Sequence, residues 1–153
     1  MGKRFAGTHR HKVEERGRVS LPAVFRKVLK DLGSSDLYLV PCMKRADAHV
    51  VMTEAGFDAF CARVEATLTT PADREAFNEF VQGRAVPLEA DEAGRIVLSA
   101  PIRQMLGIAK ELVFVGLGHV FEIRAPDAHD ARAEAVDVQA RRLIADTALT
   151  DLH

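Results

Sequence analysis

Apolar and polar positions along the chain divide it into two similar blocks separated by helical segments. In the first block, alternating side chains predict four strands, at residues 5–13, 18–21, 36–42 and 49–53. Four apolar side chains at helical spacing predict a helix between the second and third strands: Phe25, Val28, Leu29 and Leu32. Gly33 follows directly and predicts the end of this helix. The block therefore has the order strand, turn, strand, helix, strand, strand.

The second block repeats this order. Two strands, a short helix and a hairpin are predicted, at residues 84–90, 95–99, 102–106 and 111–124. Arg95 lies 77 positions after Arg18, and Arg103 lies 77 positions after Arg26. A constant offset through strand, turn and helix indicates an internal repeat.

Amphipathic helices are predicted between the two repeats and after them. We expect four units: a first repeat at 5–52, connecting helices at 53–83, a second repeat at 84–125, and a C-terminal helix with a flexible tail at 126–153. Each repeat is too small to enclose a core of its own. The predicted fold is therefore α+β, with the two repeats packed together about a pseudo-twofold axis.

Composition changes this picture only through the distribution of charge. The 153 residues are 48% hydrophobic and carry a formal net charge of −1, which fits a compact globular domain. Residues 1–30 nevertheless contain nine Lys or Arg and two Glu, a net charge of +7, which leaves −8 for the rest. This asymmetry predicts an electropositive face that binds a polyanion. A solvated charged surface without any ligand is the plainer interpretation.

Sequence motifs for catalysis, metal binding or membrane insertion are missing. No apolar run reaches the roughly 18 residues that a transmembrane helix needs. The six His and two Cys lack metal-ligand spacing, and no Ser lies in a nucleophile-elbow context. We therefore expect no enzymatic activity, cofactor, metal, small-molecule substrate or membrane partner. Cys42 and Cys61 are expected to be reduced thiols of a cytoplasmic protein.

The most informative short segment is the turn that occurs once in each repeat. Glu14 and Asp91 each lie four residues before an arginine, Arg18 or Arg95. The carboxylate can accept N–H groups of the turn or hold the guanidinium. The guanidinium can in turn reach phosphates or the base edges of guanine. An internal structural contact without a ligand explains the spacing equally well.

The predicted site consists of two groups of residues. The predicted DNA contacts are Arg18, Arg16, Arg95, Lys12, Arg10, Lys3 and Arg4. The residues predicted to support the turns are Glu14, Gly17, Asp91 and Gly94.

These segments resemble the motifs of the MraZ family of bacterial transcriptional regulators, over about residues 5–124. The matching segments are Phe5-x-Gly7, HKVEERGR at 11–18, PAVFR at 22–26, the Asp-x-x-Gly-Arg segment at 91–103, and VGLGHVFEI at 115–123. Three positions depart from the family pattern: Ala6 replaces an Arg, Glu14 replaces an Asp, and Arg124 replaces an aromatic residue.

The resemblance implies two AbrB-like swapped-hairpin repeats of β-barrel type and a ring-shaped homo-oligomer. It also implies a nucleoid-associated repressor that binds short direct repeats in double-stranded promoter DNA, upstream of the division and cell-wall gene cluster. Arg18 and Arg95 correspond to the arginines with which the family contacts DNA. The alternative from another class is a homo-oligomeric scaffold protein whose basic strip binds acidic protein partners.

Overall fold

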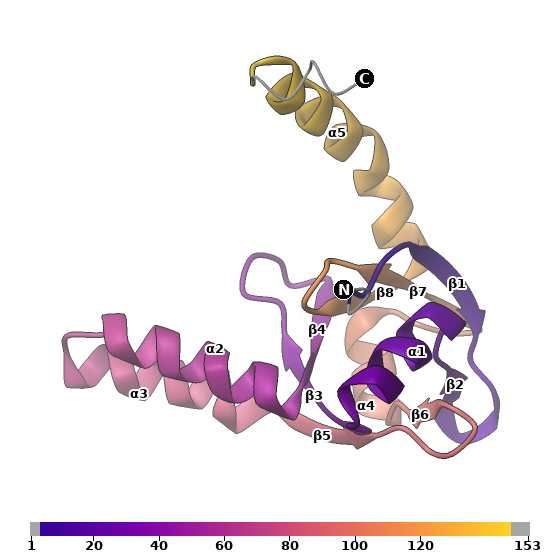
Figure 1. The fold of residues 1–153 in the computed structure, drawn as a ribbon, viewed down its shortest axis with the longest axis horizontal. Helices are drawn as coiled ribbons and strands as arrows, with labels where there is room; N and C mark the ends of the chain where they lie inside the picture. Colours follow the sequence, from indigo (N-terminus) through magenta and orange to yellow (C-terminus); the bar gives the residue numbers. More distant parts are fainter. Residues whose placement is uncertain (1–3, 148–153) are drawn as a thin grey trace.

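The structure is a computed structural model that describes residues 4–147 (Figure 1). Lys3, one of the predicted DNA contacts, and residues 148–153 of the predicted tail lie outside the described residues. In chain order the elements are β1 (Thr8–Lys12), η1 (Glu15–Gly17), β2 (Arg18–Ser20), α1 (Ala23–Leu32), β3 (Asp36–Pro41), β4 (Ala48–Thr53), α2 (Glu54–Thr67), α3 (Pro71–Phe80), η2 (Gln82–Arg84), β5 (Val86–Glu89), β6 (Arg95–Val97), α4 (Ala100–Leu106), β7 (Glu111–Gly116), β8 (Phe121–Arg124) and α5 (Pro126–Ala145). The helices and the antiparallel sheet confirm the predicted α+β class.

Six strands form one antiparallel sheet in the order β1-β7-β8-β4-β3-β5. β1 of the first repeat pairs with β7 of the second, and β5 of the second pairs with β3 of the first. β4 and β8 pair at the centre. In the second repeat, β5, β7 and β8 correspond to β1, β3 and β4 of the first. If the order is read from β5 to β1 and each strand is replaced by its counterpart, the same order results. The two repeats therefore share one sheet.

The sheet is open, which corrects the expectation of barrel-type repeats. Among the described residues, β1 and β5 form the two edges, while β2 and β6 pair only with each other. Pro87 in β5 has no N–H group to donate, which is the usual reason for proline to occur in an edge strand. The hydrogen-bonded ladder therefore ends at both sides without closing.

The main core joins aromatic side chains of both repeats. The ring of Phe25 in α1 lies 4.6 Å from that of Phe121 in β8, and Phe5 lies 5.3 Å and 5.0 Å from these two rings. All three side chains are at most 2% exposed. Because full burial of a phenylalanine contributes roughly 1.5–3 kcal/mol, this cluster holds α1 firmly against the hairpin of the other repeat.

The connecting helices begin at threonine caps, and the base of α2 packs on the face of the sheet opposite the main core. Thr53 Oγ1 accepts the N–H of Gly56 at 3.0 Å, and Thr70 Oγ1 accepts that of Asp73 at 3.1 Å. Near the sheet, α2 contributes to a second apolar cluster with β3 and β4. Further out, α2 and α3 form a helical arm, and α5 leaves the sheet in a different direction with no buried residue (Figure 1).

Candidate nucleic-acid interface

The predicted turns flank a two-stranded ribbon made by β2 and β6. The register pairs Arg18 with Val97, Val19 with Ile96, and Ser20 with Arg95. Val19 and Ile96 are fully buried. Since side chains alternate along a strand, the other two pairs share the outward face of the ribbon. Arg18 and Arg95 therefore lie diagonally across one exposed surface.

Each end of the ribbon is tied to the turn of the other repeat. We call residues 14–18 turn one and residues 91–95 turn two. Leu21 N–H, which follows β2, donates to Gly94 O of turn two at 2.9 Å. Leu98 N–H, which follows β6, donates to Gly17 O of turn one at 2.8 Å. The two turns are thereby fixed relative to each other, at the side of the molecule away from the helical arm (Figure 1).

The helix arginines of the repeats cross over in the same way. Arg103 of α4 donates from Nε to Leu98 O at 3.0 Å and lies over Gly17. Arg26 of α1 packs its aliphatic chain over Gly94, where an added Cβ would lie 2.0 Å from Arg26 Cδ. These arginines support the turn of the opposite repeat. Arg26 and Arg103 are not among the site residues predicted from the sequence, although they have the same 77-residue offset as Arg18 and Arg95.

In turn two, the carboxylate of Asp91 holds the arginine that follows the turn. Oδ1 accepts the backbone N–H of Arg95 at 2.9 Å, and Oδ2 lies 3.1 Å from Arg95 Nε. The backbone hydrogen bond from Arg95, followed by its guanidinium, lowers the pKa of the Asp91 carboxyl below its usual range. In this repeat the acid and the arginine are therefore in direct contact.

In turn one, the same contact is missing. Glu14 makes no side-chain cap, and no ion pair joins it to Arg18 within residues 4–147. Arg16 has a left-handed backbone with φ 62° and ψ 19°, and among the described residues no other non-glycine residue has a positive φ. A side chain in this conformation stores roughly 1–2 kcal/mol of strain. Arg16 and Arg18 are both exposed.

The structure brings together only part of the predicted DNA contacts. Lys12 ends β1 and enters turn one, so it shares one strand–turn–strand connection with Arg16 and Arg18. Arg10 instead forms ion pairs with Asp130 of α5 at 2.5 Å and with Glu111 of β7 at 3.9 Å.

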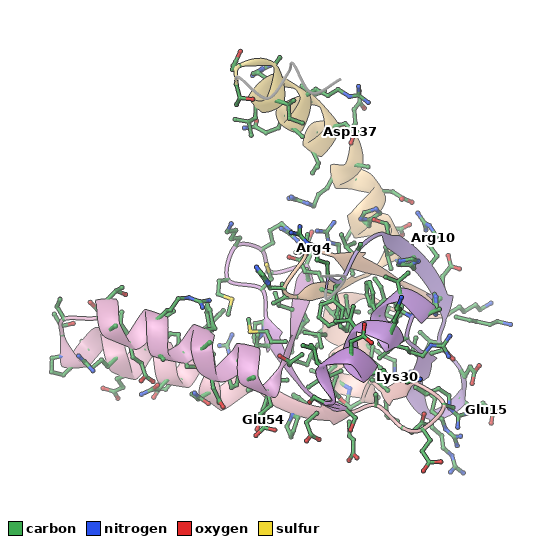
Figure 2. The ribbon with its side chains drawn as sticks, viewed as in Figure 1. Arg4, Arg10, Glu15, Lys30, Glu54 and Asp137 are labelled. Atoms are coloured by element: carbon green, nitrogen blue, oxygen red, sulfur yellow. The ribbon has the colours of Figure 1, made fainter. Side chains whose placement is uncertain are left out.

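Arg4 lies far from turn one. Figure 2 shows it well separated from Glu15, which marks the tip of that turn. Arg4 and turn one are close in the sequence, but they do not form one continuous surface.

The described part of the chain lacks two other kinds of site. Residues 4–147 contain no cluster of three or more His, Cys, Asp or Glu side chains that could hold a metal ion. No helix in this range is long and apolar enough to cross a membrane.

Comparisons with known proteins decide the family. A family model described as "MraZ protein, putative antitoxin-like" matches residues 82–148. The chain is 33% identical over 147 residues to the transcriptional regulator MraZ of Gluconobacter oxydans (strain 621H), which covers 91% of this chain and 86% of that protein. It is 34% identical over 146 residues to the transcriptional regulator MraZ of Azorhizobium caulinodans, with 91% and 90% covered. The chain belongs to the MraZ family.

The MraZ family resemblance inferred from the sequence is thus confirmed. The aromatic-Arg segment that carried part of this resemblance ends in Arg26, the residue that packs over turn two. The MraZ motifs of the two repeats therefore meet in space: the helix motif of one supports the turn motif of the other.

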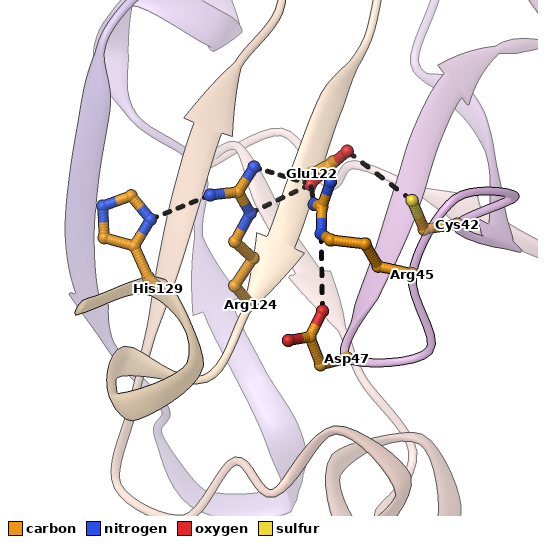
Figure 3. A network of polar contacts seen from close by, with 6 residues as sticks. All are labelled: Cys42, Arg45, Asp47, Glu122, Arg124 and His129. Carbon is orange, nitrogen blue, oxygen red and sulfur yellow. Dashed lines mark hydrogen bonds and ion pairs between the residues drawn. The ribbon is translucent and has the colours of Figure 1, made fainter. Parts of the chain in front are cut away.

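One departure from the MraZ pattern creates a buried polar network (Figure 3). Arg124 is 7% exposed, and its Nε and Nη2 each lie 2.9 Å from Glu122 Oε1. Arg45 binds the same oxygen, and its Nε lies 3.4 Å from Asp47. Arg124 Nη1 lies 3.0 Å from His129 Nδ1. In this network two guanidinium groups, of Arg45 and Arg124, face two carboxylates, of Glu122 and Asp47.

Proposed function

We propose that this protein is a sequence-specific DNA-binding transcriptional regulator that contacts double-stranded DNA through turn one and the outward face of the β2–β6 ribbon. The relatives from Gluconobacter oxydans and Azorhizobium caulinodans are each named transcriptional regulator MraZ. The major groove admits a two-stranded ribbon. The observation that carries the proposal is the exposure of Arg16 and Arg18 without ion-pair partners among the described residues, beside this ribbon.

Within this proposal the basic residues have different roles. Arg18 points from the outward face of the ribbon and makes a bidentate contact with guanine, the commonest specific contact of arginine. Lys12 and Arg16 bind neighbouring phosphates and fix the register of the protein on the duplex. Arg95 is a weaker contact because Asp91 competes for its guanidinium. Lys3, Arg4 and Arg10 add charge at the periphery.

The proposed target is a set of short direct repeats in the promoter of the division and cell-wall gene cluster, where the protein represses transcription on the nucleoid. In a ring, each subunit would present its own turn one to one of the successive DNA repeats, so that weak contacts combine through avidity. Three apolar side chains at one pocket support assembly, because Met43, Phe80 and Met105 are 42%, 37% and 63% exposed.

The finer description of the fold belongs to the same proposal. The interleaved strand order supports a pair of AbrB-like swapped hairpins at 5–52 and 84–125, related by a pseudo-twofold axis. In this arrangement neither repeat folds without the other, since the edge strand of each pairs with the hairpin of its neighbour.

A titration with DNA tests the proposal directly. Fluorescence anisotropy should show tight binding to promoter DNA that contains the direct repeats and weak binding to a scrambled duplex of equal length and composition. The logarithm of the specific affinity should fall with the logarithm of the salt concentration, with a slope of about −0.9 for each neutralised phosphate. Equal binding to both duplexes, or an affinity unaffected by salt, would favour the scaffold protein with acidic partners.

Assembly has a separate test. Light scattering at micromolar concentration should give a mass several times that of the 16.8 kDa chain. The Met105→Ser variant should lower this mass, because Met105 is largely exposed in the single chain and its loss costs no internal packing. A monomeric wild-type protein would contradict the proposed ring.

A further inference from the structure

A second basic site lies at the base of α5, formed by elements other than the ribbon. A pocket of about 470 Å³ is bounded by the β3–β4 loop, the β7–β8 hairpin and α5. Four cations and two carboxylates line it: Lys44, Arg45, Arg124, Arg132, Glu122 and Asp137. Its charged lining therefore carries an excess of two positive charges.

The internal ion pairs leave part of this positive charge uncompensated. Glu122 is shared between Arg45 and Arg124, and Arg45 also pairs with Asp47, which does not line the pocket, so these two guanidinium groups are largely compensated. Arg132 forms no ion pair in the described part of the chain, and its Nε is buried without a hydrogen-bond partner. Lys44 is exposed and has no ion pair among the described residues. A buried donor without a partner costs free energy, and it commonly indicates a position where an ion or a water belongs.

The contact between Arg124 and His129 involves a neutral imidazole. A guanidinium can only donate, so Arg124 Nη1 must donate to an unprotonated His129 Nδ1, 3.0 Å away. Burial, and next the charge of Arg124, lower the pKa of His129. The imidazole of His129 is therefore neutral at pH 7 and adds no positive charge to the pocket.

The remaining wall of the pocket is apolar. Val115 and Leu117 of the β7–β8 hairpin and Val136 of α5 contribute to it, and Leu117 is 50% exposed. Ligand pockets of this size typically combine an apolar wall with a few polar groups that fix orientation. The ligand that matches both features has an anionic head and an apolar or planar body.

We propose that this pocket binds a small organic phosphate, with the phosphate held by Arg132 and Lys44 and the body against Leu117 and Val136. Arginine forks match phosphate oxygens and give charge-assisted hydrogen bonds. The ligand would connect the β3–β4 loop to α5, which otherwise leaves the sheet without a buried residue. Binding would therefore fix α5 against the body of the molecule. The site is independent of the proposed function, because it requires no contact with DNA.

The test uses calorimetry on the full chain with three probes: AMP, inorganic pyrophosphate and inorganic phosphate. Ionic strength is kept constant with NaCl. We expect one AMP per chain, bound more tightly than inorganic phosphate because AMP also contacts the apolar wall. Arg132→Gln should weaken AMP binding at least tenfold. The matched control is Arg141→Gln, an exposed arginine of the same helix that does not line the pocket and should leave binding unchanged.

A second variant and a second readout guard against effects on folding. Lys44→Ala removes an exposed side chain without an ion pair and should weaken AMP binding severalfold while the circular dichroism spectrum is unchanged. Hydrogen exchange in α5 should slow when AMP is added to the wild-type protein. Absence of binding by all three probes, or an Arg132→Gln variant that binds AMP like wild type, would overturn the proposal. So would an Arg132→Gln variant that loses promoter affinity as fully as Arg18→Ala, because the cations would then belong to the DNA interface.

Discussion

Turn one and turn two share their backbone hydrogen bonds but differ in the left-handed conformation of Arg16 and in their side-chain contacts. Glu14 N–H donates to Arg18 O at 2.8 Å, and Asp91 N–H donates to Arg95 O at 3.0 Å. Only in turn two does the carboxylate also accept the arginine N–H and contact its guanidinium. The short side chain of aspartate suits such local hydrogen bonds to the backbone, whereas glutamate carries one more methylene group. One copy of the motif therefore holds its arginine, and the other leaves it exposed.

This difference shows how a duplicated motif can divide two tasks. Both turns are needed to hold the ends of the ribbon, because each accepts a hydrogen bond from the strand of the other repeat. The ion pair of turn two makes it a structural contact. The exposed arginines and the strained backbone of turn one suit it to a ligand, since strain of this kind occurs most often at functional sites.

The largest difference between the turns is expected for their glycines. A Cβ on Gly17 would lie 2.0 Å from the backbone oxygen of Leu98, whereas a Cβ on Gly94 would meet the flexible chain of Arg26. Both glycines have positive φ, at 79° and 77°. Gly17→Ala should therefore lower the free energy of unfolding by about 2–5 kcal/mol, from strain and backbone displacement together. Gly94→Ala should cost less, about 1–2 kcal/mol, mainly from strain, because the aliphatic chain of Arg26 can move aside.

Urea unfolding followed by circular dichroism measures both variants. Gly83→Ala is the control, because an added Cβ there would lie 3.8 Å from the nearest atom and the φ is not positive. Its effect should stay within about 0.5 kcal/mol. Equal losses for the Gly17 and Gly94 variants would mean that the two turns are packed alike.

The next largest effect is expected for the affinity of the protein for promoter DNA. Arg18→Ala should abolish specific binding, since a lost bidentate guanine contact costs roughly 1–3 kcal/mol of discrimination and an oligomer multiplies this loss. Arg95→Ala should weaken binding less, because its guanidinium is already held by Asp91. Anisotropy at one salt concentration compares the two variants.

Two controls accompany this comparison. Lys30→Ala removes an exposed charge of the same basic segment from α1 and should leave the sequence preference intact. Size-exclusion profiles and circular dichroism verify the oligomer and the fold. An Arg18→Ala protein that keeps its oligomer and binds promoter DNA at wild-type affinity would make turn one a purely structural element.

The sequence predicted the elements well because their causes are local. Alternating side chains, the helical spacing of apolar residues and the constant 77-residue offset all act within one segment or between two equal ones. Alternation does not reveal which strands pair, so the exchange that joins β1 to β7 and the open edge at β5 emerged only from the structure. Arg10 was predicted to contact DNA because its partner in the structure, Asp130, lies 120 positions away in the sequence.

The network around Arg124 escaped prediction for a related reason. Arginine is rarely buried unless it is paired. Arg124 pairs with Glu122, which also binds Arg45, and it contacts His129. Arg45 and His129 come from a loop and a helix that the sequence gives no reason to bring together. The difference between the turns was visible as Glu14 against Asp91, but the sequence left open whether the longer side chain could make the same contact.

Exchanging the two acids should exchange the properties of the turns. Glu14→Asp should allow the carboxylate to accept Arg18 N–H, raising the melting temperature by up to about 3 °C and reducing promoter affinity. Asp91→Glu should release Arg95 and lower the melting temperature by a similar amount. Differential scanning fluorimetry and anisotropy measure the two effects. A Glu14→Asp variant with unchanged affinity would show that the ion pair does not restrain the arginine.

The smallest expected effect is the pH dependence of turn two. The pKa of Asp91 is lowered from 3.8 in the folded protein, chiefly by the hydrogen bond from Arg95 N–H. Its contribution to stability is therefore fully present above about pH 4 and is lost as the pH falls through the lowered pKa. Asp91→Asn should melt below the wild-type protein at pH 7, and this difference should shrink towards pH 3. Glu14→Gln, where the carboxylate has no partner within residues 4–147, should differ little from wild type throughout. A constant difference for Asp91→Asn between pH 7 and pH 3 would show that the charge of Asp91 is not what holds Arg95.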